Sequence, residues 1–170
     1  MRRLRPASGT RGRMLLSAAA IAFAVALGSG FARAAESGNE ADVRRALGAF
    51  VDALNDLRWD DFHSWFADDV TLFNPEIPEV DNLGRIEGRE AVERSFRKVF
   101  DAARRGASGP PYLHIVPRNV RVQMLDRAAV ATFEFDRDGG TIGRRTFVFR
   151  ESPGGWRIVH IHASNTARRE

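Results

Sequence analysis

Residues 128–164 read AAVATFEFDRDGGTIGRRTFVFRESPGGWRIVHIHAS, and apolar and polar residues alternate along much of this stretch. A period of two is typical of β-strands, because successive side chains of a strand point to opposite faces of the sheet. Asp138-Gly139-Gly140 and Pro153-Gly154-Gly155 interrupt the alternation and are typical of tight turns. The stretch therefore predicts three antiparallel strands, at 128–136, 141–150 and 156–164.

The residues immediately before this stretch predict two further strands, and three helices are predicted earlier in the chain. The strands are expected at 112–116 and 119–125. Helical spacing of apolar residues predicts a first helix, with its face at Val43, Ala46, Leu47, Phe50, Val51 and Leu54. A short second helix is expected to carry Trp59, Phe62, Trp65 and Phe66, and a third, after Gly88, to carry Val92, Phe96, Val99, Phe100 and Ala103.

A brief strand at 70–73 and a loop at 76–87, with room for a short strand at 85–87, connect the second helix to the third. Asn74-Pro75 ends the brief strand, because proline lacks the N–H that a sheet needs. Three helices followed by a run of antiparallel strands predict an α+β domain with the helices on one face of the sheet.

The N-terminal segment predicts a signal peptide at residues 1–34. A basic region ends at Arg13, an apolar run follows from Met14 to Leu27, and Ala32-Arg33-Ala34 has the small residues of a cleavage site. This run of fourteen residues is shorter than the roughly 20 that a spanning helix needs. We therefore expect a periplasmic or secreted protein whose mature domain comprises residues 35–170, with no membrane partner after cleavage.

The charge and the composition exclude several classes of function. The net charge is +4, but the signal segment holds six arginines and no acid, so the rest of the chain sums to −2. A mildly acidic domain has no general attraction for nucleic acid. The absence of cysteine excludes disulfides, zinc–thiolate sites and cysteine nucleophiles. Without a metal-binding motif, neither a metal site nor a cofactor is expected.

Large apolar residues occur on both predicted faces of the sheet. In 128–136, one face would carry Val130, Thr132 and Glu134, which we assign to the helix side, and the other Ala131, Phe133 and Phe135. Helices on one side can cover only one face. A second copy of the chain is the simplest cover for the other, so a homodimer or a larger homo-oligomer is expected, with His160 and His162 at that interface.

The ending Gly155-Trp156-Arg157-Ile158-Val159-His160-Ile161-His162-Ala163-Ser164 resembles the ending of SnoaL-like domains of the nuclear transport factor 2-like superfamily. It is especially similar to the association (hub) domain of calcium/calmodulin-dependent protein kinase II. Thr71-Leu72-Phe73-Asn74-Pro75-Glu76 and Glu87-Gly88 resemble two further segments of that domain. The resemblance covers about residues 42–165 and implies a cone-shaped α+β fold, with three helices packed on a curved antiparallel sheet.

This resemblance implies a pocket between helices and sheet. The arginines that line the hub pocket would be replaced by Glu134, Phe147 and Ala163, so a preference for acidic ligands is not expected, and Arg144-Arg145 are expected on a solvated face. We expect the pocket to bind a small, largely apolar molecule. The predicted ligand-binding residues are Phe62, Trp65, Phe73, Glu76, Tyr112, Thr132 and Phe147.

Glu134 is the predicted catalytic residue. A carboxylate in an apolar cavity has a raised pKa and is suited to proton transfer, as in the ketosteroid isomerases of the same superfamily. One alternative function is therefore a cofactor-independent isomerase or lyase with Glu134 as acid or base, and another is a hub-like assembly domain. Glu134 could equally form an ion pair with Arg121 or Arg145, and Tyr112 could be exposed.

Overall fold

The structure is a computed structural model, and it describes residues 39–75 and 84–167 of the chain. The predicted signal segment and the predicted ligand-binding residue Glu76 lie outside these residues. No helix within the described ranges combines the length and the apolarity that crossing a membrane requires.

Three α-helices and six strands make up this part of the chain. The helices cover residues 39–55, Trp59–His63 (α2) and Arg89–Gly106 (α3). The strands are Phe66–Phe73 (β1), Arg85–Glu87 (β2), Arg118–Leu125 (β3), Ala128–Arg137 (β4), Thr141–Ser152 (β5) and Gly155–Ala167 (β6). The predicted α+β class is confirmed, and so are the five strands that correspond to β2, β3, β4, β5 and β6.

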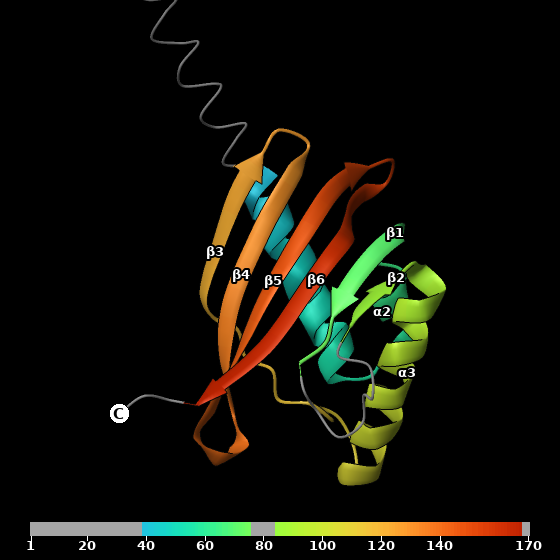
Figure 1. Ribbon diagram of the computed structural model, residues 1–170, viewed down its shortest axis with the longest axis vertical. Helices are drawn as coiled ribbons and strands as arrows, with labels where there is room; N and C mark the ends of the chain where they lie inside the picture. Colours follow the sequence, from blue (N-terminus) through green and yellow to red (C-terminus); the bar gives the residue numbers. More distant parts are fainter. Residues whose placement is uncertain (1–38, 76–83, 168–170) are drawn as a thin grey trace, which may run out of the picture. The chain divides into compact units, whose positions relative to one another are not determined.

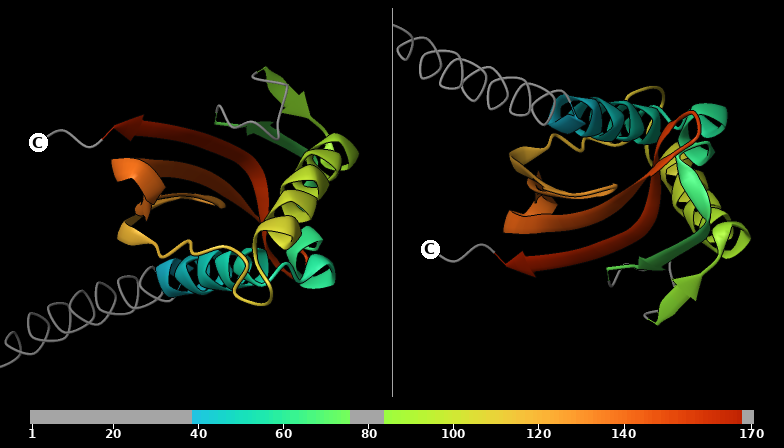
Figure 2. Two further views of the ribbon diagram at one scale, coloured as in Figure 1. Left: turned by 90° about the horizontal axis from the view of Figure 1, so that it is seen from below. Right: turned by 90° about the horizontal axis from the view of Figure 1, so that it is seen from above.

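One six-stranded sheet contains all the strands, in the order β2-β1-β6-β5-β4-β3. Every neighbouring pair is antiparallel except β1 and β6, which run parallel. The sheet is strongly curved, and the helices lie on one of its faces (Figures 1 and 2). We call this the inner face and the opposite one the outer face.

The first and third helices form where the apolar spacing predicts them. Val43, Leu47 and Phe50 of the first helix are almost completely buried, while the residues between them are mostly exposed. Gly88 precedes α3 with a φ of +82°, which glycine adopts without the steric cost of a side chain. Its N–H donates to the Val70 carbonyl at 2.8 Å and thereby fixes the start of α3 beside β1.

The predicted second helix is too long. It ends at His63, and Phe66 already belongs to β1. Pairing with β6 makes the end of this segment a strand. The Ile158 N–H donates to the Trp65 carbonyl at 2.8 Å, and Phe66 pairs with Ile158. The strand predicted at 70–73 therefore begins four residues earlier.

The strand predicted at 112–116 is wrong. This segment is irregular, and its backbone binds the end of the first helix instead of a strand. The N–H groups of Tyr112 and Leu113 donate to the Asn55 carbonyl at 2.8 and 3.1 Å. The Asn55 side chain both donates to the Ile115 carbonyl and accepts from the Ile115 N–H, each at 2.9 Å. One asparagine therefore supplies the partners that a neighbouring strand would otherwise provide.

A bulge in β6 explains why this strand looked apolar on both faces. The pairing with β5 shifts register between Val148–His160 and Phe149–Ile158, so Val159 is an extra residue. A bulge of this kind reverses the face to which the following side chains point. Ile158 and Ile161 are consequently both buried, at 0% and 2% exposure.

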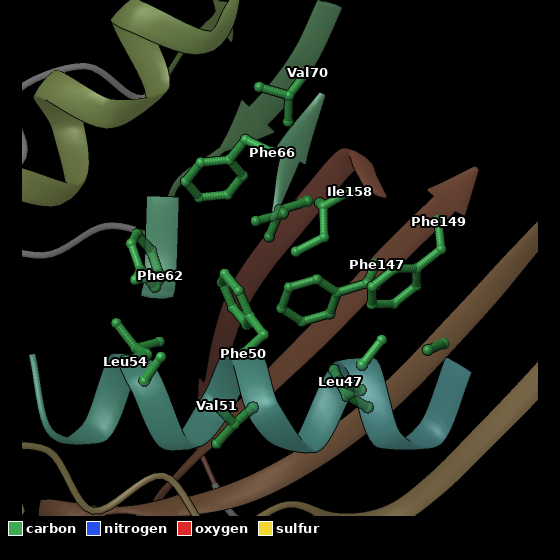
Figure 3. Close-up of a cluster of buried hydrophobic side chains, with 14 of the residues drawn as sticks. Leu47, Phe50, Val51, Leu54, Phe62, Phe66, Val70, Phe147, Phe149 and Ile158 are labelled. Carbon is green, nitrogen blue, oxygen red and sulfur yellow. The ribbon is translucent and has the colours of Figure 1, made fainter. Parts of the chain in front are cut away.

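The core lies between the first helix and the inner face of the sheet. Phe50 is at its centre, with ring centroids 4.9, 6.0 and 5.3 Å from those of Phe62, Phe66 and Phe147 (Figure 3). These rings come from four different elements. Their contacts join the helices to both halves of the sheet.

Candidate functional site

Two rows of side chains cross the inner face of the sheet beyond the aromatic core. The register places Phe133, Arg145 and Ala163 in the first row, and Phe135, Gly143 and Asn165 in the second. Phe135 covers Gly143 so closely that a Cβ there would lie 2.3 Å from its ring. This end of the inner face is therefore partly aromatic and partly polar.

Arg145 is half-buried in the first row. Its Nη1 donates to the carbonyls of Arg144 and Ser164 at 2.8 and 3.0 Å, and its guanidinium carbon lies 4.8 Å from the centre of the Phe135 ring. Burial, followed by repulsion from Arg137, lowers the pKa of Arg145 to about 10. The side chain therefore stays charged at neutral pH in surroundings that hydrate it poorly.

A hollow of about 430 Å³ lies where β1 ends and β6 continues, and we call it the β6 hollow. Phe73 pairs with His162, and β6 runs on to Ala167 without β1 beside it. The hollow is lined by Phe73, Asn74, Pro75, His162, Ala163, Ser164 and Asn165. Its volume lies within the roughly 300–1,000 Å³ of small-molecule sites.

Two amides give the β6 hollow its polar character. The Asn74 Nδ2 donates to the hydroxyl of Ser95 in α3 at 2.9 Å, which fixes the end of β1 to that helix. The Oδ1 of Asn165 is buried and has no hydrogen-bond partner in the described part of the chain. Buried polar atoms nearly always have a partner, so we expect this oxygen to accept from a donor outside the described residues, such as water.

The predicted ligand-binding residues do not form one site. Phe62 and Phe147 lie in the aromatic core, at 0% and 3% exposure. Trp65 and Tyr112 are half-buried beside that core. Of those that the structure describes, only Phe73 lines the β6 hollow, whereas Thr132 lines a second hollow, of about 350 Å³, with Arg44 and residues 120–123.

The predicted placement of Glu134 on the helix side is wrong. Its neighbours Phe133 and Phe135 are buried at 3% and 5% exposure, and Phe133 stacks on Phe147 of the core. Strand geometry then directs Glu134 to the outer face. There its carboxylate accepts a hydrogen bond from the Asn119 Nδ2 at 3.0 Å, and on the sheet it lies opposite Arg144.

His160 and His162 lie on the outer face, as expected. The His160 Nδ1 is 2.7 Å from the Thr71 hydroxyl oxygen, and both imidazoles contact the Phe73 ring. Burial, followed by the proximity of His162, lowers the pKa of His160 below 6.5. No group of three or more potential ligands within the described residues could hold a metal ion.

The lowered pKa of His160 predicts that acid destabilises the fold through this residue. Between the two pKa values the unfolded chain binds the proton better, so the contribution is complete above pH 6.5 and is lost as the pH falls. His160→Gln should therefore lose less stability than the wild type between pH 7.5 and 5 in urea denaturation. His114→Gln, at an exposed histidine, is the control and should behave like the wild type.

Asn165 lines the β6 hollow, and Arg145 and Arg137 lie on the inner face, but the sequence pattern predicts a pocket role for none of them. Arg145 was expected on a solvated face together with Arg144, which is indeed exposed. The sequence nonetheless contains a pattern that places Arg145 on the inner face. Residues 145, 147 and 149 share one face of a strand, and Phe147 and Phe149 are plainly core residues.

The profile of the SnoaL-like domain family matches residues 43–168, nearly all of the described part. Among proteins with curated functions, no match is found. Solved structures, in contrast, resemble this chain along most of its length.

Three of these structures illustrate the range of proteins that share the fold. A proposed dehydratase of the nuclear transport factor 2-like family from Streptomyces avermitilis is 19% identical with a TM-score of 0.64, and the match covers 78% of this chain and 99% of that one. A proposed ketosteroid isomerase from Parabacteroides distasonis is 24% identical with a TM-score of 0.51, covering 71% and 84%.

The third is a proposed calcium/calmodulin-dependent protein kinase II association domain from Thiobacillus denitrificans. It is 24% identical with a TM-score of 0.55, and the match covers 71% of this chain and 92% of that one. Identities this low demonstrate the fold alone, and the fold hosts many functions. Together with the family match, they show that this chain belongs to the SnoaL-like family and has a nuclear transport factor 2-like fold.

Proposed function

We propose that this SnoaL-like domain binds a small, largely apolar molecule in the β6 hollow, at the edge of β6 where β1 ends. The observation that carries the proposal is the hollow itself, which combines adequate volume with apolar walls at Phe73, Pro75 and Ala163. The Asn165 side chain, whose Oδ1 has no partner among the described residues, adds a polar group to the lining. The remaining lining residues, Asn74, His162 and Ser164, are polar, so a ligand there would meet both apolar walls and hydrogen-bonding groups.

The isomerase or lyase alternative receives less support from the site. It needs a desolvated carboxylate beside a second polar group that can reach the same substrate atom. Glu134 is on the outer face and is held by Asn119. The hub-like alternative needs no ligand, so occupancy of the hollow distinguishes it from binding.

Native mass spectrometry of the protein purified from the exported fraction tests the binding proposal. We expect a chain that begins near Ala35, which would also support export, together with a retained small molecule. Ser164→Trp should lower the occupancy by filling the hollow. Thr166→Trp is the matched control, because it lies on the same face of β6 but does not line the hollow. An empty protein that takes up no small molecule would overturn the proposal.

We also propose that the domain self-associates through the outer face. Two adjacent rows cross this face over five strands and contain a single charged residue, Arg121. The rows are Gln123–Val130–Val148–His160–Thr71 and Arg121–Thr132–Thr146–His162–Phe73. Depletion of charge at the centre is typical of protein interfaces, and Glu134 and Arg144 would lie at the rim.

Val148→Lys should therefore convert a dimer into a single folded chain. Val148 is half-buried at the centre of the uncharged rows, and a lysine there would be desolvated in an interface without a partner. Light scattering after size-exclusion chromatography measures the mass. Thr166→Lys, near the end of the same face, should leave the mass unchanged. A wild-type protein that is already a monomer at high concentration would contradict the proposal.

A further inference from the structure

Two neighbouring histidines belong to the outer-face rows through which we propose that the domain self-associates. His160 and His162 lie two residues apart on β6, beyond the bulge, so their imidazoles point to the same face at a spacing of about 7 Å along the strand. Both rings contact that of Phe73, with centroid distances of 6.0 and 5.8 Å. His160 is half-buried and His162 is exposed. Imidazole gains a charge in mildly acidic solution, so the charge of these rows depends on the pH.

The side chains next to the two histidines in these rows are neutral. They are Thr71, Phe73, Thr146 and Val148. The one charged residue of the two rows, Arg121, is three strands from His162, or about 14 Å at the usual spacing of about 4.8 Å per strand. A protonated imidazole would therefore have neither a carboxylate nor a second charge directly beside it in the rows.

The other charged side chains of the outer face surround these rows and come from all six strands. They are Asp69 on β1, Arg85 and Glu87 on β2, Arg118 on β3, Glu134 and Asp136 on β4, Arg144 and Arg150 on β5, and Arg157 on β6. Glu87 and Arg85 lie opposite Thr71 and Phe73, two strands from the histidines.

The four carboxylates among them are already bound within the chain. Asp69 accepts from Arg150 at 2.8 and 2.9 Å, and Glu87 accepts from Arg85 at 2.6 Å. Asp136 accepts from Arg118 at 2.7 Å, and Glu134 accepts from Asn119 at 3.0 Å. A protonated His160 or His162 would thus have to compete for each carboxylate that the described residues place on this face.

A second copy of the chain would not supply the missing acid. Two copies of one chain associate most often through the same patch on each. The partner would then bring the same two histidines and the same bound carboxylates to the interface. Protonation would place up to four positive charges in a region from which association excludes water, and a desolvated charge without a partner is unfavourable.

We propose that pH controls the self-association of this domain, and that protonation of His160 and His162 separates the copies. This inference rests on the proposed self-association and names its regulation. Burial, followed by the proximity of His162, already lowers the pKa of His160 below 6.5 in the single chain, and further burial in an interface acts in the same direction. Because the associated state then binds fewer protons, association is strongest above pH 6.5 and weakens as the pH falls.

Sedimentation velocity of the purified protein over a concentration series, at pH 7.5 and 5.5 and one ionic strength, tests the inference. An imidazole with an ordinary pKa of about 6.5 that binds its proton only in the separate chain weakens association about tenfold between these values. One such imidazole from each copy gives about 100-fold. We therefore expect the dissociation constant of the wild type to be about 100-fold larger at pH 5.5.

Glutamine variants identify the histidines responsible. His162→Gln keeps a polar side chain that cannot be protonated, so it should associate at pH 7.5 like the wild type and lose most of the pH dependence. The double variant His160→Gln/His162→Gln should lose all of it. His162→Arg carries a permanent charge and should weaken association at pH 7.5 as well. His114→Gln, at an exposed histidine of the irregular segment before β3, is the control and should keep the full pH dependence.

Far-UV circular dichroism separates dissociation from unfolding. The spectrum at pH 5.5 should match that at pH 7.5. If it is lost together with association, acid acts on the fold, and the inference is overturned. Equal dissociation constants at both pH values, or a pH dependence that survives in the double variant, would overturn the pH control and leave the self-association intact. A single chain at every concentration and at both pH values would overturn both.

Discussion

Phe50→Ala is expected to lower the free energy of unfolding by about 3–5 kcal/mol, the usual cost of removing a buried phenylalanine. Phe50 is 1% exposed and contacts Phe62, Phe66 and Phe147, which belong to α2, β1 and β5. The cavity cannot collapse easily, because its walls are rings anchored in separate elements. Urea denaturation measures the change.

Leu125→Ala is the control for Phe50→Ala. Leu125 is 56% exposed at the end of β3, so its truncation should change the stability by no more than about 0.5 kcal/mol. A loss below about 1 kcal/mol for Phe50→Ala would contradict the central place of this ring in the core.

Gly143→Ala is expected to destabilise the protein by about 1–3 kcal/mol, the range for overpacking a core. The new Cβ would lie 2.3 and 2.4 Å from two carbons of the Phe135 ring, so the ring or the backbone must move. Phe135 is 5% exposed, with its ring beside Phe133 and Arg145, which leaves it little freedom. Thermal and urea denaturation measure the loss.

A double-mutant cycle identifies the cause of that loss. In a Phe135→Leu background the same Gly143→Ala change should cost much less, because the atoms that clash are absent. Gly48→Ala is the matched control, since a Cβ at this exposed helical glycine meets nothing within 4 Å and should stabilise by roughly 0.5–1 kcal/mol. An equal cost of Gly143→Ala in both backgrounds would exclude the contact with Phe135 as its origin.

The elements that the sequence predicts well are those whose pattern is local. The first helix shows its apolar face over three turns, and the hairpin between β4 and β5 shows both its alternation and its turn. The predictions are wrong where contacts with a segment far away in the sequence determine the secondary structure. Phe66 fits a helical spacing equally well, and only its pairing with Ile158 makes it a strand residue. Residues 112–116 alternate like a strand, but Asn55, 60 residues before Ile115, binds their backbone.

The site was harder to predict than the fold, because it depends on which face each strand residue occupies. The period of two in β4 is clear, but it does not say which of its two faces meets the helices. Placing Glu134 on the helix side exchanges the predicted faces of every residue in β4. Phe133 and Phe135 are the larger apolar residues, and their size favours the opposite assignment. The bulge at Val159 added a second ambiguity, because it exchanges the faces of β6 in mid-strand.

The parallel pairing of β1 with β6 has a consequence for how the chain acquires its structure. Phe66 and Ile158 are neighbours in space but are separated by most of the domain in sequence, so β1 finds its central partner only when the last strand has been synthesised. Such non-local contacts slow folding and delay its completion until β6 has been synthesised. A nascent chain with this topology cannot complete its sheet before β6 has been synthesised, which would suit the export that the N-terminal segment predicts.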